Sequence, residues 1–225
     1  MIDLLAGIAT ILGFTMQVYD KFSDKESEKE ELNDTTLLLF LKELSVKSKA
    51  IKEIHQKYHS LSGDMRPVAT FLSNPYTYGK IEVKQRELRN ELKKALQGPS
   101  AIVAQNHLSA DLQSNFEELK INSKDKDVLL GAINSLNDCE IKAPLRKIIN
   151  AQFYIETLHN GFCDTMQKVG RFSRGDWGES EFSFILTNHR IFTSDFYQII
   201  DSADIILMGY LDIYHYIANS KSQIS

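Results

Sequence analysis

The chain has 225 residues, of which 43% are hydrophobic and 25% are charged, so it can build a packed core and is not a disordered polymer. Its formal net charge of −4 excludes a general attraction to nucleic acid or anionic lipid, which leaves only local patches for such binding. The two cysteines lack CxxC spacing and are too few for a disulfide scaffold, which favours a cytoplasmic protein.

Residues 1–22 are predicted to form an apolar helix, from Ile2 to Phe22. Residues 4 to 19, 16 in all, carry no charge, and this length is below the roughly 20 residues of a membrane-spanning helix. Small or polar residues make only a narrow stripe on this helix, so protein or lipid must cover most of its surface. The side chains predicted to insert into a membrane or to form an interface are Ile2, Leu5, Ile8, Ile11, Leu12, Phe14 and Met16.

An acidic segment, residues 23–34, follows the apolar helix. It holds six acidic and two basic residues, so its charge of −4 equals the net charge of the whole chain. Such a run does not bury enough apolar surface to order itself and is typical of a solvated hinge.

Residues 35–225 are predicted to form an all-α, antiparallel bundle of about six to eight helices without a sheet. Apolar residues recur at three- and four-residue steps, strict alternation is scarce, and the whole chain has only four prolines and eleven glycines. The pattern favours one compact domain with the first helix packed on it.

Prolines and glycines mark the predicted helix ends. Gly63 and Pro67 are expected to end the second helix, and residues 98–100 to stop the third and cap the next. Pro144 suits the first position of a later helix. The C-terminal apolar pattern fits one long helix or two joined near Asp201.

Two pairs of residues have the spacing of chemically active groups. His55 and His59 lie one helical turn apart, as two metal ligands do, but no third ligand is identifiable, so a solvated pair is favoured. His159 and Cys163 share a helix face and suggest a base and a nucleophile, whereas the favoured interpretation is a buried thiol beside a histidine at the core edge. No metal or other cofactor is predicted.

A loop from Arg171 to Gly178 has the composition of a binding surface. Arg171, Arg174, Asp176 and Trp177 combine the residue types that are enriched at interface hot spots. The alternative, which the pattern favours, is a connecting loop with Trp177 inserted into the core.

The N-terminal residues also resemble those of a known family. The Ala6-Gly7-Ile8 and Leu12-Gly13-Phe14 pieces, followed by the run from Tyr19 to Phe22, are similar to the start of HeLo-type domains, which are helical bundles of cell-death and prion-controlled signalling proteins. The resemblance covers some 20 residues. It implies a first helix that is hidden in the bundle at rest and inserts into membrane on activation.

Three functions remain open at this point. The first is a membrane-perturbing or membrane-targeting effector in defence or cell-death signalling, which would move from the cytoplasm to a membrane lipid surface. The second is a soluble scaffold or adaptor that binds a protein partner. In this function the first helix is part of the core or forms the interface of a homo-oligomer. The third is an enzyme of unknown class, which is disfavoured because phosphate-binding glycine loops and nucleophile elbows are absent from the sequence. A basic surface that would bind nucleic acid is also absent, so no nucleic-acid partner is predicted.

Overall fold

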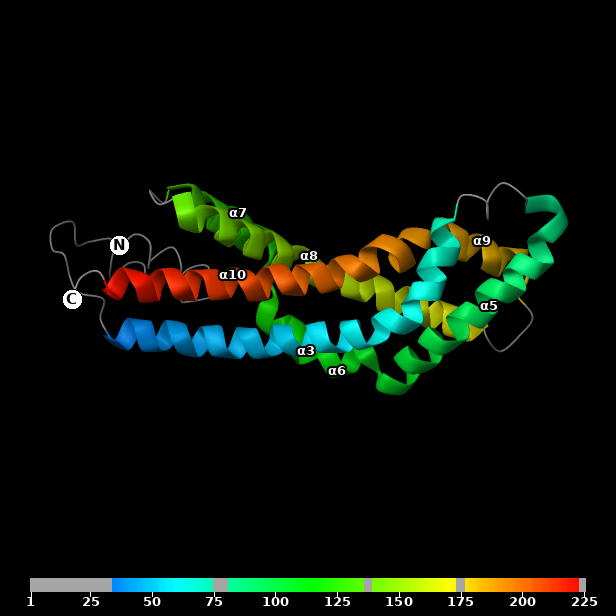
Figure 1. Ribbon diagram of the computed structural model, residues 1–225, viewed down its shortest axis with the longest axis horizontal. Helices are drawn as coiled ribbons and strands as arrows, with labels where there is room; N and C mark the ends of the chain where they lie inside the picture. Colours follow the sequence, from blue (N-terminus) through cyan, green and yellow to red (C-terminus); the bar gives the residue numbers. More distant parts are fainter. Residues whose placement is uncertain (1–33, 75–80, 136–138, 173–176, 223–225) are drawn as a thin grey trace. The chain divides into compact units, whose positions relative to one another are not determined.

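The computed structural model of the protein describes residues 34–74, 81–135, 139–172 and 177–222 (Figure 1). These residues form an all-α bundle with seven α-helices and no strand, which confirms the predicted fold class and helix number. The apolar helix 1–22 and nearly all of the acidic segment lie outside the described residues. None of the helices within the described ranges combines the length and the apolar content that a membrane crossing needs.

The chain divides into two compact units, each assembled from separate stretches of sequence. Unit 1 comprises residues 1–52, 117–154 and 203–225, and unit 2 comprises residues 53–116 and 155–202. Four helices contribute residues to both units: α3 (Asp34–Ser73), α6 (Leu108–Leu119), α8 (Cys139–Phe172) and α10 (Phe196–Ser222). The others are α5 (Ile81–Asn106) and α9 (Glu179–Thr187) in unit 2, and α7 (Ser123–Ser135) in unit 1.

Unit 1 packs the start of α3, the start of α8 and the end of α10 together with α7. Figure 1 shows α3 beginning at the end of the unit where α10 finishes, so the two helices run in opposite directions. Aliphatic side chains that are less than 9% exposed fill its centre. They include Ile51, Leu129, Ile133, Leu145, Ile148, Ile149, Ile206 and Ile213. Tyr210 accepts a hydrogen bond on its hydroxyl from Gln152 Nε2 at 3.3 Å inside this core.

Unit 2 has a more aromatic core. Tyr58 of α3, Phe162 of α8 and Phe196 of α10 surround one another with ring centroids 5.1–5.8 Å apart. Each of these three side chains is fully buried, and such aromatic contacts add to the stabilisation that burial alone provides. The centre of unit 2 is therefore a junction of three helices that are distant in the sequence.

The helix ends predicted at Gly63 and Pro67 are wrong, because α3 continues to Ser73 with Pro67 inside it. A proline in a helix interior costs about 3 kcal/mol. Met65, Val68 and Leu72 flank it and are at most 1% exposed, and burial of each contributes roughly 1.5–3 kcal/mol. Packing of the apolar face therefore outweighs the local penalty.

The stop predicted at residues 98–100 is also wrong. Helix α5 runs through Pro99 to Asn106, so Ser100 lies inside the helix and caps nothing. The buried side chains of Leu96 and Val103 lie on either side of this proline in the sequence and continue the apolar face through it. The helical path actually breaks at His107, eight residues later.

Pro144 is not the first residue of a helix, since α8 begins at Cys139. Lys142, ahead of the proline, donates a hydrogen bond to the carbonyl oxygen of Asn134 at 3.0 Å, and Arg146 bonds the Asn134 side chain. These two bonds tie the first turns of α8 to the end of α7, whose last carbonyl groups lack partners within their own helix.

The C-terminal pattern breaks near Asn188 rather than at Asp201, which lies inside α10. Asn188 caps α9: its backbone N–H and its side-chain Nδ2 both donate to the Phe184 carbonyl, at 3.0 and 2.8 Å. A π-helical turn, Ile191–Asp195, then leads into α10. Asparagine competes for backbone groups in this way, which makes it a common helix terminator.

Candidate functional site

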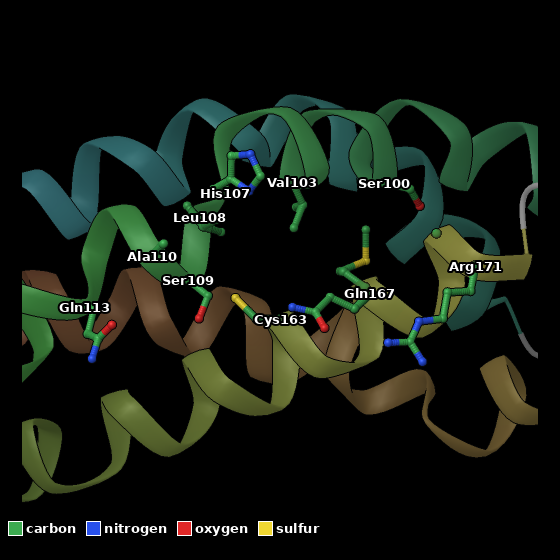
Figure 2. Close-up of a pocket in the computed structure, with 12 residues that line it drawn as sticks. Ser100, Val103, His107, Leu108, Ser109, Ala110, Gln113, Cys163, Gln167 and Arg171 are labelled. Atoms are coloured by element: carbon green, nitrogen blue, oxygen red, sulfur yellow. The ribbon is translucent and has the colours of Figure 1, made fainter.

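A groove of about 550 Å³ lies in unit 2, where the end of α5 and the start of α6 face the second half of α8 (Figure 2). Twelve residues line it: Ser100, Val103, His107, Leu108, Ser109, Ala110, Gln113, Cys163, Met166, Gln167, Gly170 and Arg171. Its volume falls within the roughly 300–1,000 Å³ that is usual for small-molecule sites. None of the twelve is acidic, although acidic residues outnumber basic ones by 30 to 26 in the chain.

The bend that opens one wall of the groove is centred on His107. This residue has φ of 42°, in the left-handed region that costs a residue with a Cβ roughly 1 kcal/mol or more. Its carbonyl oxygen accepts hydrogen bonds from the N–H groups of Ala110 at 2.7 Å and Asp111 at 3.0 Å, so it starts α6. An ion pair of 3.4 Å between Lys57 and Asp111 ties the first turn of α6 to α3. The strained backbone is thus held by contacts that its carbonyl and the first turn of α6 make.

A single buried polar atom on the wall of the groove has no protein partner. Ser100 is 7% exposed, and its Oγ makes no hydrogen bond in the structure. Buried hydroxyl groups nearly always have a partner, so an unpaired one calls for a physical reason. Figure 2 shows Ser100 on α5 and Arg171 on α8 at the same end of the groove.

Behind the groove lies a buried polar cluster of unit 2. The Tyr58 hydroxyl lies 2.6 Å from Nδ1 of His159, and the His159 ring stacks on Phe116 with centroids 4.2 Å apart. Cys163, one turn further along α8, places its Sγ 3.8 Å from both ring nitrogens of His159. Because Cys163 also lines the groove, its thiol lies between the cluster and the groove.

Burial sets the protonation states of this cluster. It lowers the pKa of His159 to about 4 and raises the pKa of Cys163 to about 12. Burial, with a smaller contribution from Cys163, also raises the pKa of Tyr58 well above its ordinary value. At neutral pH all three groups are uncharged, and a protonated thiol is a poor nucleophile. The arrangement therefore has the chemistry of a packed polar core, as the favoured interpretation of the sequence held.

The other predicted pair lies on α3 of unit 2. The rings of His55 and His59 have centroids 5.6 Å apart. Within the described ranges, no group of three or more histidine, cysteine, aspartate or glutamate side chains is placed to hold a metal ion. The two imidazoles therefore come together with each other but not with further ligands in this part of the chain.

The predicted binding loop is only partly described. Arg171 lies in the last turn of α8, and its exposed side chain lines the groove, whereas Trp177 is 8% exposed and its Nε1 has no hydrogen-bond partner. Arg174 and Asp176 lie outside the described residues. So do the seven side chains predicted to insert into a membrane or to form an interface, Ile2, Leu5, Ile8, Ile11, Leu12, Phe14 and Met16.

Unit 1 presents a different kind of surface. In the described part of the chain, all seven large apolar side chains that are 41% or more exposed belong to this unit. They are Val46, Val128, Tyr154, Ile205, Met208, Leu211 and Tyr214. The last four follow one another at three-residue steps on the outer side of α10, whose inner side carries the buried Ile206, Tyr210 and Ile213. The exposed side of α10 is therefore mixed, because Asp204 and Asp212 are also exposed and lie among these four apolar residues.

The sequence did not reveal the groove. Its lining comes from both sides of a bend at a histidine, and neither a glycine nor a proline marks that position. The exposed apolar residues of α10 carry only a partial signal in the sequence, because Asp204 and Asp212 interrupt the apolar pattern beside the core positions. Comparisons with protein families, with curated proteins and with solved structures found no match to this chain.

Proposed function

We propose that the protein is a membrane-perturbing or membrane-targeting helical effector of the defence or cell-death type, in which Ile2 to Phe22 is the inserting element. The sequence supports this through the uncharged stretch of residues 4 to 19, whose surface is apolar on most sides. The acidic segment that follows favours a hinge between this element and the bundle. The resemblance to HeLo-type domains points in the same direction.

The observation that carries the proposal is the apolar surface of α10. Ile205, Met208, Leu211 and Tyr214 of α10 are 41–57% exposed and belong to unit 1. Exposed apolar residues gathered on one part of a protein commonly mark a protein or membrane contact. The chain thus carries an apolar N-terminal stretch in its sequence and, on α10 of unit 1, a group of exposed apolar side chains.

A second candidate is a soluble scaffold or adaptor in which Ile2 to Phe22 covers the outer face of α10 permanently. Residues 23–33 reach up to roughly 36 Å when extended, at about 3.3 Å per residue. Helix α10 finishes at the same end of unit 1 at which α3 starts (Figure 1), so in this candidate the segment 23–33 would lead from α3 back to α10. The same contact would hide the first helix at rest in the effector, so the two candidates differ only in whether it is released.

The proposal is tested with the full chain and dye-loaded vesicles of phosphatidylcholine and phosphatidylserine. We expect leakage by the wild type and its loss in the double variant Leu12→Asp, Phe14→Asp, which places charge on the apolar face. The matched control is Thr10→Asp, Gln17→Asp, which adds the same charge to the polar stripe of the same helix and should retain leakage.

Absence of leakage and of vesicle co-flotation for the wild type, from pH 5 to 8 and at vesicle curvatures from large to small, would refute the effector. Protection of residues 2–22 from proteolysis with and without vesicles would then favour the scaffold. Equal loss of leakage in both double variants would show that net charge, rather than the apolar face, controls the effect.

A further inference from the structure

We propose that the groove of unit 2 binds a small amphipathic anion, with an apolar body of about six carbon atoms and a carboxylate or phosphate head held by Arg171 and Ser100. This inference does not depend on the proposed membrane function, because no residue of the proposed inserting element lines the groove. It assigns a ligand class to a site that the sequence does not indicate.

The apolar body is accommodated by the middle of the groove. Val103, Leu108 and Met166 line it, and each is at most 8% exposed. Figure 2 shows Val103 and Leu108 reaching from one wall toward α8. Ligand sites typically combine such an apolar lining with a few polar groups that fix the orientation of the ligand.

The head is recognised at the end of the groove where Ser100 and Arg171 lie (Figure 2). Ser100 Oγ is buried and makes no hydrogen bond within the protein, so rotation of this hydroxyl toward the groove would give it the partner that it lacks, in the form of a ligand oxygen. The Arg171 guanidinium is at the exposed rim and supplies a positive charge with several donors. Gln167 adds a neutral polar side chain to the lining, closer to Cys163 than to Ser100 (Figure 2).

The charges around the groove favour an anion over a cation. The twelve lining residues contain Arg171 and His107 and no carboxylate. The carboxylate of Asp111, in the first turn of α6, is paired with Lys57 at 3.4 Å. A ligand cation would therefore find no countercharge on the lining, whereas an anionic head finds a guanidinium and an unpaired hydroxyl.

The test is isothermal titration calorimetry of the full chain with four probes: hexyl phosphate, hexanoate, 1-hexanol and inorganic phosphate. We expect one hexyl phosphate or hexanoate per chain, and affinities at least about tenfold weaker for hexanol and for inorganic phosphate, because each lacks one half of the recognised structure. Comparison of hexyl phosphate with hexanoate distinguishes the two possible heads.

Three variants locate the site. Arg171→Gln should weaken binding of the preferred anion by about tenfold or more and Ser100→Ala by about threefold or more, because a charged and a neutral hydrogen bond are lost. Arg66→Gln removes an exposed arginine of α3 in the same unit, outside the lining, and should leave the affinity unchanged. Circular dichroism and thermal unfolding verify that each variant is folded.

Three results would overturn the proposal. The first is no saturable binding of either anion at millimolar concentration. The second is binding of hexanol as tight as that of the anions, which would exclude head recognition. The third is equal weakening by Arg66→Gln and Arg171→Gln, which would indicate unspecific attraction to positive charge.

Discussion

The Tyr58 hydroxyl and the His159 Nδ1 atom lie 2.6 Å apart in the core of unit 2, although 101 residues separate them in the chain. The pair joins α3 to α8 at the place where the aromatic core is densest. Because both groups are buried away from water, each provides the hydrogen-bond partner that water would provide to the other in the unfolded chain. Loss of either partner leaves a polar atom in an apolar environment.

Tyr58→Phe removes this hydroxyl while keeping the ring. We expect the free energy of unfolding to fall by about 1–3 kcal/mol, because Nδ1 of His159 is left buried without its hydroxyl partner. Chemical denaturation monitored by circular dichroism measures the change. Tyr154→Phe is the control, since that ring is 53% exposed and its hydroxyl loss should change stability by less than about 0.5 kcal/mol. Equal stability of the two variants would contradict the role of the pair.

Acid should destabilise the protein through His159. Burial lowers its pKa from 6.5 to about 4, so between these values the unfolded chain binds a proton that the folded chain does not. Its stabilising effect is therefore complete above pH 6.5 and is lost as the pH falls toward 4, by roughly 3 kcal/mol between pH 7 and pH 4. Unfolding of wild type and His159→Gln across this range measures it, and parallel curves for the two would exclude His159 as the cause.

Cys163 should react slowly in the folded protein. Its pKa of about 12 compares with 9.0 for an ordinary thiol, so at pH 8 the thiolate fraction is lower by about a thousandfold. A Cys139→Ser variant leaves Cys163 as the one thiol, and a chromogenic disulfide reagent measures its rate. We expect slow labelling under native conditions and rapid labelling in urea. A fast native phase would mean that the thiol is accessible and ionised.

Two glycines of unit 1 should respond oppositely to alanine. A Cβ at Gly209 of α10 would lie 2.7 Å from Cγ1 of Ile148, and Gly209→Ala should cost roughly 1–3 kcal/mol because β-branched side chains move little. A Cβ at Gly131 of α7 meets nothing within 4 Å, so Gly131→Ala should stabilise by up to about 1 kcal/mol. Thermal unfolding measures both. A neutral Gly209→Ala would show that α10 and α8 separate easily.

The sequence predicted the helical class and most core positions because both follow from periodicity. Leu61, Phe116 and Ile155 stand on apolar faces in the sequence and are at most 4% exposed in the structure. The predicted helix ends at Pro67 and Pro99 were wrong because tertiary packing outweighed the local preference of proline. The true bend at His107 depends on a positive φ that histidine adopts only under the constraint of its neighbours.

The candidate sites were less predictable than the fold. The spacing of His159 and Cys163 correctly predicted that they share one helix face. Both side chains are uncharged at neutral pH because they are buried, and the local sequence pattern does not specify that burial. Arg171 was predicted as a binding residue from the composition of its loop. In the structure it lies at the rim of a groove whose other wall comes from α5 and α6. Ser100, interpreted from its position after Pro99 as a cap, is instead a buried hydroxyl without a partner.

The interleaved chain path of the two units has a consequence for synthesis on the ribosome. Unit 2 includes residues up to 202 and unit 1 extends beyond it, so neither has all its segments until most of the chain has emerged. At about 5–20 residues per second, the first 200 residues take roughly 10–40 s to make. During that interval the apolar face of α3 lacks the parts of α8 and α10 against which it packs in the folded protein, and stays exposed on the nascent chain.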